Sequence, residues 1–313
     1  SNLSEQKEVF EIRKAGLNIL MSMKGDKKPV AFIEDCAVSL DHLAEYTARL
    51  KEIFKKYNTS GMFYAHASVG TLHVRPVLNM KSDQDIKNMK AIAEEAFEMV
   101  KKYRGSHSGE HGDGIVRSEF HEKMFGKKII NSFEQIKDSF DKKNLLNPHK
   151  IVRPFKSDDR SLMRYKSGYK AENISTHYDW SSWGQFSDAV EMCNNNGACR
   201  KLDSGVMCPS YRVTKEEKDL VRGRANTLRL ALSNQLPKDS FVSKGMYETM
   251  ELCVSCKACQ RECPMSVDMA KMKSEFLSHY YKKFSMRIKD RVTSDMPRLI
   301  WLLKIVAPIF NKV

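Results

Sequence analysis

The sequence predicts an α+β domain followed by a mostly helical domain. Short apolar runs alternate with stretches of helical periodicity from Phe10 to about Pro154, and elements that alternate in this way form a layered domain around one core. Beyond about residue 190 the pattern is mostly helical, and seven of the eight cysteines lie between residues 193 and 263. With 313 residues and 41% apolar content, the chain is long enough for two domains.

Three short runs in the first part are expected to form buried strands: PVAFIED (29–35), GMFYAH (61–66) and TLHVRPV (71–77). Between the first two, Ser39 is placed to cap a helix whose apolar stripe is Leu40, Leu43, Leu50 and Ile53. A longer helix is predicted over 83–103, where apolar residues mark one face: Ile86, Met89, Ile92, Ala93, Ala96, Phe97 and Val100.

The domain boundaries follow from where this periodicity stops. We expect the first domain to cover 1–153. The stretch 155–190 has no periodicity, so 154–190 is predicted to be an extended linker. Residues 191–313 are predicted to be a helical domain in which the cysteines lie at helix ends, followed by an apolar tail.

Composition limits the class of protein. No stretch approaches 18 consecutive apolar residues, and the N-terminal SNLSEQKEVF lacks the basic-then-apolar pattern of a signal peptide, so a cytoplasmic protein is expected. The net charge is +14, but Lys and Arg are spread through acid-rich helices, which favours a solvated surface over a nucleic-acid partner. Cysteines in metal-type spacing indicate a reducing compartment and a metal centre.

The cysteine run near the C-terminus, CVSCKACQRECP, is typical of an iron–sulfur site. Cys253, Cys256, Cys259 and Cys263 form C-x2-C-x2-C-x3-C-P, in which three thiolates hold one cubane and the fourth binds a different cluster in two-cluster ferredoxins. Zinc sites more often pair two CxxC units across a dozen or more residues. The spacing therefore predicts iron–sulfur rather than zinc.

An earlier stretch, MCNNNGACRKLDSGVMCPSY (192–211), resembles the same motif with Asn196 in place of the middle cysteine. Crossed ligation then assigns Cys208 to a [4Fe–4S] cluster with Cys253, Cys256 and Cys259. The remaining Cys193, Cys199 and Cys263 suit a [3Fe–4S] cluster, or a second [4Fe–4S] cluster if another group supplies a fourth ligand. The alternative is an empty second site whose cysteines only pack.

The first domain carries a candidate site for a divalent metal. His66 and His73 lie seven residues apart on two predicted strands, and Glu110 precedes His111 between two glycine-rich turns. Two histidines and a carboxylate can bind a metal with one open position, which leaves His111 free to act as a base. The pattern alone also fits structural histidines and a tight glycine turn without chemistry.

Motifs along nearly the whole chain carry a family resemblance: RKAGLNILMSMKGDKKPVAFIEDCAV (13–38), YAHASVGTLHVRP (64–76), SGEHGDGIVR (108–117), KNLLNPHKIV (143–152), CNNNGACRK, MCPSYR, RGRANTLR (222–229) and CVSCKACQRECP. The chain resembles the C-terminal part of a bacterial FAD-linked D-2-hydroxyacid dehydrogenase with a fused ferredoxin-type cluster domain. This family lies in the vanillyl-alcohol-oxidase-like superfamily, with D-lactate, glycolate and D-2-hydroxyglutarate dehydrogenases as relatives. The resemblance implies a substrate (cap) domain followed by a mostly helical domain with two clusters.

The resemblance also assigns roles to residues. His66, His73 and Glu110 match the family's divalent-metal ligands, usually zinc, and His111 matches the histidine that accepts the substrate hydroxyl proton. Arg13 matches an arginine that binds a substrate carboxylate, and Asn147 matches a residue beside the flavin ring. The lysine that D-2-hydroxyglutarate dehydrogenases carry aligns near Ile33 here, with Lys28 as a candidate replacement, so the choice of hydroxy acid stays open.

The implied function is oxidation of a 2-hydroxy acid to a 2-oxo acid by FAD, with electrons passing through the clusters to a quinone or a carrier protein. The FAD-binding half lies N-terminal to the substrate domain in this family, and nothing in residues 1–12 matches it. We therefore expect an excised fragment that is inactive alone and whose partner is the N-terminal half. The alternatives are a standalone iron–sulfur electron-transfer subunit or a zinc-dependent nucleic-acid binder.

The C-terminal tail is basic and apolar. Residues 261–313 contain eleven Lys or Arg and five Asp or Glu, and PRLIWLLKIVAPIF (297–310) carries charge only at Arg298 and Lys304. This run is too short to span a bilayer. We expect it to pack on the FAD-binding half, with peripheral attachment at the inner membrane as the second option.

Overall fold

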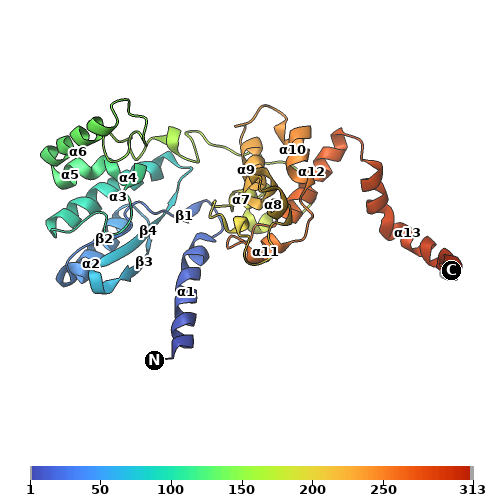
Figure 1. Ribbon diagram of the computed structural model, residues 1–313, viewed down its shortest axis with the longest axis horizontal. Coiled ribbons are helices and arrows are strands. Elements are labelled where there is room, and N and C mark those ends of the chain that lie inside the picture. The colour runs from blue at the N-terminus through green and yellow to red at the C-terminus, as the bar shows by residue number, and fades with distance from the viewer. Residues whose placement is uncertain (1, 311–313) are drawn as a thin grey trace. The chain divides into compact units, whose positions relative to one another are not determined.

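Residues 2–310 are described by a computed structural model in which the chain divides between Lys170 and Ala171 into two units (Figure 1). The division falls inside the predicted linker, 154–190, and both sides of that stretch are bound to their own unit. Lys90 forms an ion pair with Asp158 at 2.8 Å in the first unit, and helix α7 (Phe186–Glu191) belongs to the second. The region that lacks periodicity is therefore ordered by tertiary contacts and by short helices, of which α7 is the longest.

The first unit is built on an antiparallel sheet with β4 (Thr71–Asn79) at its centre. Strand β3 (Gly61–His66) pairs with β4 in a register that places Tyr64 opposite His73. Strand β1 (Lys27–Pro29) places Pro29 opposite Val77, and β2 (Cys36–Ala37) pairs with the start of β4. An antiparallel sheet covered by helices confirms the α+β prediction, and the strands expected over 61–66 and 71–77 are present.

The strand predicted over 29–35 is wrong. Only Pro29 of that run lies in a strand, and the chain then turns, with Asp35 in the left-handed region at φ 59°. Phe32 and Ile33 are nevertheless buried in the core. A short apolar run signals burial whether it is a strand or an irregular segment, and here the segment is irregular because its last two residues, Glu34 and Asp35, are used as buried carboxylates.

Strand β4 separates the hydrophobic core from the candidate site. Side chains alternate between the two faces of a strand, and Leu72, Val74 and Leu78 belong to the core. The intervening residues His73 and Arg75 therefore point to the opposite face, yet both are buried. Buried polar residues on the second face of a sheet need partners, and those partners form the site described below.

Two helices complete the core. Helix α3 (Asp83–Lys102) buries all seven residues of its predicted stripe, and the Ser82 side chain at its N-cap accepts a hydrogen bond from the Asp85 backbone. Helix α2 (Leu40–Lys56) begins after Ser39 as predicted, but the Ser39 side chain makes no capping bond. Its buried residues are Tyr46, Leu50 and Phe54, whereas Leu40 is exposed, because the first turn lies at the edge of the core. The unit also contains α1 (Leu3–Met21), α4 (Gly114–Arg117), α5 (His121–Phe125) and α6 (Lys127–Phe140).

The second unit is helical, as predicted, and its cysteines lie at or near helix ends. After α7 come α8 (Pro209–Thr214), α9 (Val221–Leu232), α10 (Lys244–Glu251), α11 (Ala258–Glu262), α12 (Met269–Lys283) and α13 (Ile288–Phe310). Cys208 is the N-cap of α8, and Cys263 is the C-cap of α11. Glu275 on α12 anchors the start of the unit, because its buried carboxylate accepts hydrogen bonds from the backbone of His177 and Tyr178 and from the Trp180 ring.

The C-terminal tail forms α13, which contains Pro297 and Pro308. Ile300, Trp301 and Ile305 on this helix are exposed. Among residues 2–310, no helix combines the length and the apolar character that a membrane span requires.

Candidate active site and cluster-binding cysteines

Two strands and one loop bring the predicted metal ligands together. His73 Nε2 lies 2.8 Å from Glu110 Oε1, and His66 Nε2 lies 3.6 Å from the same oxygen. One ligand atom from each residue lies within 4.8 Å of the others, a spacing that a single divalent ion can bridge with a modest shift. Burial lowers the pKa of His73, against the opposite influence of Glu34 and Glu110, and a neutral imidazole is the form that binds a metal.

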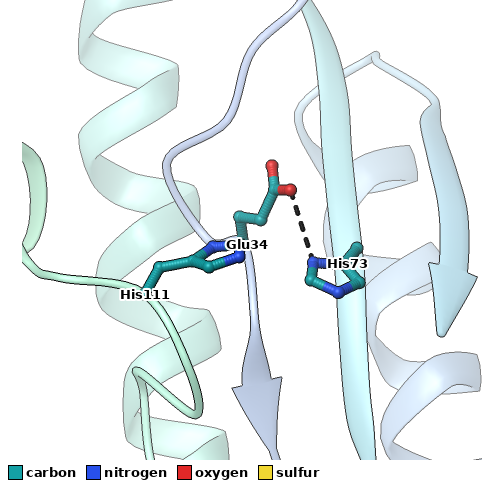
Figure 2. Close-up of side chains that lie close together, drawn as sticks. All are labelled: Glu34, His73 and His111. Carbon is teal, nitrogen blue, oxygen red and sulfur yellow. Dashed lines mark ion pairs between the residues drawn. The ribbon is translucent and has the colours of Figure 1, made fainter. Parts of the chain in front are cut away.

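Glu34 lies on the other side of His73 and was not predicted. Figure 2 shows its carboxylate pointing toward His73 on β4, with His111 approaching from a separate loop. The His73 Nδ1 atom is 3.3 Å from Glu34 Oε1, close enough for an ion pair although not aligned as a hydrogen bond. A carboxylate behind a histidine fixes the ring and leaves its other nitrogen for a metal.

Glu34, His73 and His111 also satisfy the spacing of a metal site, so two ligand sets share His73. Arg75 decides between them, because its Nε and Nη2 donate to the Glu34 carboxylate at 2.7 and 2.6 Å. Glu34 is thus already neutralised and 8% exposed, whereas the Glu110 side chain is 41% exposed. The set of His66, His73 and Glu110 is therefore the better candidate for a metal site.

Asp35 holds the loop that carries Glu110 and His111. Its Oδ2 accepts hydrogen bonds from the backbone N–H of Glu110 at 2.9 Å and of His111 at 2.7 Å, and its Oδ1 forms an ion pair with Arg117. Burial raises the pKa of Asp35, but these bonds outweigh it and the net shift is downward. An ionised carboxylate under the loop therefore fixes the backbone of both residues.

A cavity of about 660 Å³ opens in front of these residues. Arg13 on α1 enters it, with Nη2 3.3 Å from both ring nitrogens of His66 and the guanidinium 5.9 Å from the centre of the Tyr64 ring. His111 lines the same cavity with its side chain 48% exposed. The cavity thus presents a cation, an accessible imidazole and the candidate metal ligands to one small molecule.

Asn147 lies apart from that cavity, in a second hollow of about 510 Å³. The hollow is mostly apolar and also includes the turn Gly112, Asp113 and Gly114, which directly follows His111. Asn147 adopts the left-handed conformation at φ 48°, which Asn tolerates better than most residues. The loop 108–114 therefore connects the two hollows: its Glu110 and His111 line the cavity with the candidate metal ligands, and its last residues line the hollow that contains Asn147.

In the second unit, four cysteines line one pocket: Cys208, Cys253, Cys256 and Cys259. They come from both motifs, since Cys208 starts α8 and the other three lie around α11. This is the set that crossed ligation predicts for a cubane. Cys193, Cys199 and Cys263 are absent from its lining.

A buried arginine lines this pocket and contacts one of its cysteines. Arg224 on α9 is 0% exposed and its Nη1 lies 3.9 Å from Cys208 Sγ. Its Nε donates to the Thr249 backbone at 2.9 Å and its Nη2 to Ser210 Oγ at 3.2 Å. Lys273 adds a second cation and donates to the Cys253 carbonyl at 2.6 Å. Two cations thus lie beside the cysteines, and one of them, Arg224, is also 3.7 Å from a buried carboxylate oxygen of Asp219. A cation near a thiol favours the thiolate form that binds a cluster.

The first cysteine motif forms a turn around its asparagines. Asn196 accepts a hydrogen bond from the Ala198 backbone at 2.8 Å and donates to Asn194 at 2.7 Å. Cys193 and Cys199 are both buried, and burial raises the pKa of Cys199 to about 11. Asn196, where a middle cysteine would stand, is thus exposed and engaged within its own turn.

Comparison with known proteins agrees with both halves of this description. Residues 1–151 match the family of FAD linked oxidases, C-terminal domain, and residues 189–267 match the 4Fe-4S dicluster domain. The chain is 29% identical to D-2-hydroxyglutarate dehydrogenase from Pantoea ananatis, over 97% of this chain and 33% of that protein. It is also 29% identical to D-2-hydroxyglutarate dehydrogenase from Escherichia coli, over 99% and 33%.

A D-lactate dehydrogenase from Archaeoglobus fulgidus is 32% identical over 42% of this chain and 29% of that protein. The chain spans about a third of the length of these curated relatives. Residues 1–151 thus match a C-terminal domain of the FAD-linked oxidase type, and the same chain continues into a 4Fe–4S dicluster domain.

Proposed function

We propose that this chain is the substrate-binding and electron-transferring part of a FAD-dependent D-2-hydroxyacid dehydrogenase, which oxidises a small 2-hydroxy acid to a 2-oxo acid. The observation that carries the proposal is the convergence of His66, His73 and Glu110 beside Arg13 and His111 in one cavity. The names of the relatives that match nearly the whole chain support the substrate class.

Each residue of the cavity has a separate task. Arg13 binds the substrate carboxylate through its guanidinium fork. The three metal ligands hold a divalent ion, for which zinc fits the donor set, and that ion would lower the pKa of the substrate hydroxyl. His111, with its backbone fixed by Asp35, accepts the hydroxyl proton.

The FAD-binding half is the expected partner, and FAD would accept the hydride from the substrate. The hollow at Asn147 supports this, because its lining is mostly apolar and it adjoins the loop of His111. Helix α1 also exposes a series of large apolar side chains: Leu3, Val9, Phe10, Ile12 and Ile19. Exposed apolar surface of this kind usually marks a contact with another domain or protein.

We infer that electrons leave FAD through two clusters. Cys208, Cys253, Cys256 and Cys259 hold a [4Fe–4S] cluster, and Cys193, Cys199 and Cys263 hold a second cluster with a vacant corner, of the [3Fe–4S] type, unless a further ligand completes a cubane. The final acceptor is a quinone or a carrier protein. We expect the protein in the cytoplasm, with α13 packed on the FAD-binding half rather than on the inner membrane, which liposome flotation of the complete enzyme would test.

The decisive experiment uses a polypeptide that contains this chain together with a FAD-binding half. D- and L-isomers of lactate, 2-hydroxybutyrate and 2-hydroxyglutarate would be assayed by bleaching of the flavin under anaerobic conditions. We expect bleaching by one D-isomer or more, and loss of bleaching in His111→Asn with zinc content unchanged. A protein with FAD and both clusters that no 2-hydroxy acid bleaches would overturn the proposal and leave the electron-transfer subunit as the better description.

A further inference from the structure

A second group of histidines lies behind the loop 108–112, outside the cavity described above. His107 Nε2 lies 3.8 Å from Asp113 Oδ1, and His121 Nε2 lies 2.8 Å from Asp113 Oδ2. One ligand atom from each residue lies within 4.8 Å of the others. Donor atoms on a tetrahedral zinc ion lie roughly 3.3 Å apart. The two measured separations, one to each oxygen of the Asp113 carboxylate, lie on either side of that value.

His107 has no hydrogen-bond partner in the part of the chain that the structure describes. Its side chain is 0% exposed, and neither its ring nitrogens nor Asp113 Oδ1 makes a hydrogen bond among the described residues. The ring lies edge-on to Phe97 and His121 at 5.3 Å and to Phe125 at 5.6 Å. A polar group buried without a partner costs roughly 1–3 kcal/mol, so a histidine held this way needs an explanation that a packing role does not supply.

His121 shows the arrangement of a metal-binding histidine. Its Nδ1 lies 3.3 Å from the Ile151 carbonyl, while its Nε2 faces Asp113. Both neighbours are acceptors, but a neutral imidazole donates through only one nitrogen. A donor bond from Nδ1 to a backbone carbonyl leaves the Nε2 lone pair for a cation, and this partner is typical of histidines that bind metals.

We propose that His107, Asp113 and His121 form a second, structural site for a divalent cation of the zinc type, separate from the site at His66. Arg117 lies beside this group, with Nε 3.4 Å from Asp113 Oδ1, and it also pairs with Asp35. Two carboxylates thus surround one arginine, which leaves a negative charge for the ion. Two nitrogens and an oxygen are a common donor set for zinc.

The position of this site indicates what it does. His107 directly precedes the loop 108–112 and Asp113 directly follows it, while His121 starts α5. An ion held by all three clamps both ends of the loop that carries Glu110 and His111 and ties it to a helix. The site therefore fixes the geometry of the candidate active site without contacting a substrate.

The test is a metal count on the complete chain with its clusters, purified in buffer that contains zinc. Zinc, manganese, cobalt and nickel would be measured by mass spectrometry for the wild type and for His107→Phe, His121→Phe and His66→Phe. Phenylalanine suits the aromatic surroundings of His107. His42→Phe serves as the control, because His42 is exposed and its ring centre lies 4.8 Å from that of Tyr103, so an aromatic side chain suits that position too.

We expect His107→Phe and His121→Phe each to hold one ion fewer than the wild type, and the control to hold the same number. His66→Phe also loses one ion, and the double variant of His66 and His107 loses both. In the His66→Phe background, a chelator should lower the melting temperature, and this shift should vanish when His107 or His121 is also replaced. An unchanged metal count in folded His107→Phe and His121→Phe would overturn the proposal, whereas an unchanged count in His66→Phe alone would count against the active-site metal instead.

Discussion

The guanidinium of Arg75 donates two hydrogen bonds to the carboxylate of Glu34, at 2.7 and 2.6 Å, and both side chains are buried. The same carboxylate lies 3.3 Å from His73. Arg75 and His73 occupy the same face of β4, two residues apart, so one strand presents both a candidate metal ligand and the cation that neutralises the acid behind it. Glu34 thus lies where it can orient the His73 ring, and its own charge is already paired.

Replacement of Glu34 should therefore weaken metal binding. In Glu34→Gln the His73 ring loses its charged neighbour while the volume is conserved. Loss of such an outer partner typically costs 10- to 100-fold in affinity, and we expect a decrease of that order for zinc at the His66 site. Competition with a fluorescent chelator measures it, with Glu45→Gln on the exposed face of α2 as the control. Equal affinities in the two variants would exclude this role.

Asp35 should be required for stability as well as for the site. It is 0% exposed and pairs with Arg117, which is also buried. Asp35→Asn leaves the Arg117 charge with only Asp113 beside it, at 3.4 Å, and removes the negative charge under the backbone of Glu110 and His111. Loss of one member of a buried pair typically costs about 3–5 kcal/mol, and urea unfolding should show a decrease of that size. A change below about 1 kcal/mol would show that water or Asp113 replaces the lost charge.

The Glu119 carboxylate should stabilise the first unit to an extent that depends on pH. Burial raises its pKa, but hydrogen bonds from Ser157 and the ammonium groups of Lys156 and Lys90 outweigh this and lower it from 4.5 to about 2. Because the folded pKa lies below the unfolded one, the stabilisation is present above about pH 4.5 and is lost as the pH falls toward 2.

Glu119→Gln should consequently destabilise the protein at pH 7 by up to roughly 3 kcal/mol, a value that solvent screening of this partly exposed cluster of charges reduces. The difference from the wild type should shrink when urea unfolding is repeated at pH 3. Glu122→Gln, at an exposed neighbouring position, should show no such trend. A gap between wild type and Glu119→Gln that is independent of pH would mean that the contacts with Ser157 act through packing rather than charge.

Elements with a regular repeat of apolar side chains could be predicted from the sequence. Buried polar residues whose partners lie far away in the chain could not. The stripe from Ile86 to Val100 determined α3 because one face of a helix must be buried. Glu34 and Asp35 gave no such signal, since an acid next to an apolar run is ordinarily exposed, and only Arg75 and Arg117 make their burial favourable. The grouping of His107 with His121 was missed for the same reason. The two lie fourteen positions apart in the sequence, and their common neighbour Asp113 brings them together only in the folded chain.

Arg224 should raise the reduction potential of the cluster that Cys208 helps to hold. Its guanidinium lies 3.9 Å from Cys208 Sγ, and hydrogen bonds and positive charge near the sulfurs favour the reduced cluster, whose net charge is more negative. Arg224→Met should lower the potential in a redox titration followed by EPR, and Lys273→Met should do so to a smaller extent. Arg287→Met, which removes an exposed arginine paired with Glu251, should leave the potential unchanged. No shift in either variant would contradict the prediction and would show that nearby carboxylates, such as Asp219 at 3.7 Å from Arg224 Nη2, already offset these charges.

Asn196, which stands where a middle cysteine would be expected, should determine whether the second cluster is of the [3Fe–4S] or the [4Fe–4S] type. Asn196 is exposed and engaged by Ala198 and Asn194, so its side chain is not free to complete a cubane with Cys193, Cys199 and Cys263. A [3Fe–4S] cluster there predicts about seven irons per chain and an EPR signal from the oxidised protein, because an oxidised cluster of that type is paramagnetic and an oxidised [4Fe–4S] cluster is not.

Asn196→Cys supplies a fourth thiolate at the middle position, and it should add about one iron per chain and abolish the signal of the oxidised state. Asn194→Cys, at the position two residues earlier in the same turn, is the matched control and should change neither. A wild type that is EPR-silent when oxidised would contradict the prediction in one of two ways: about eight irons would mean that another group completes a second cubane, and about four would mean that Cys193, Cys199 and Cys263 hold no cluster.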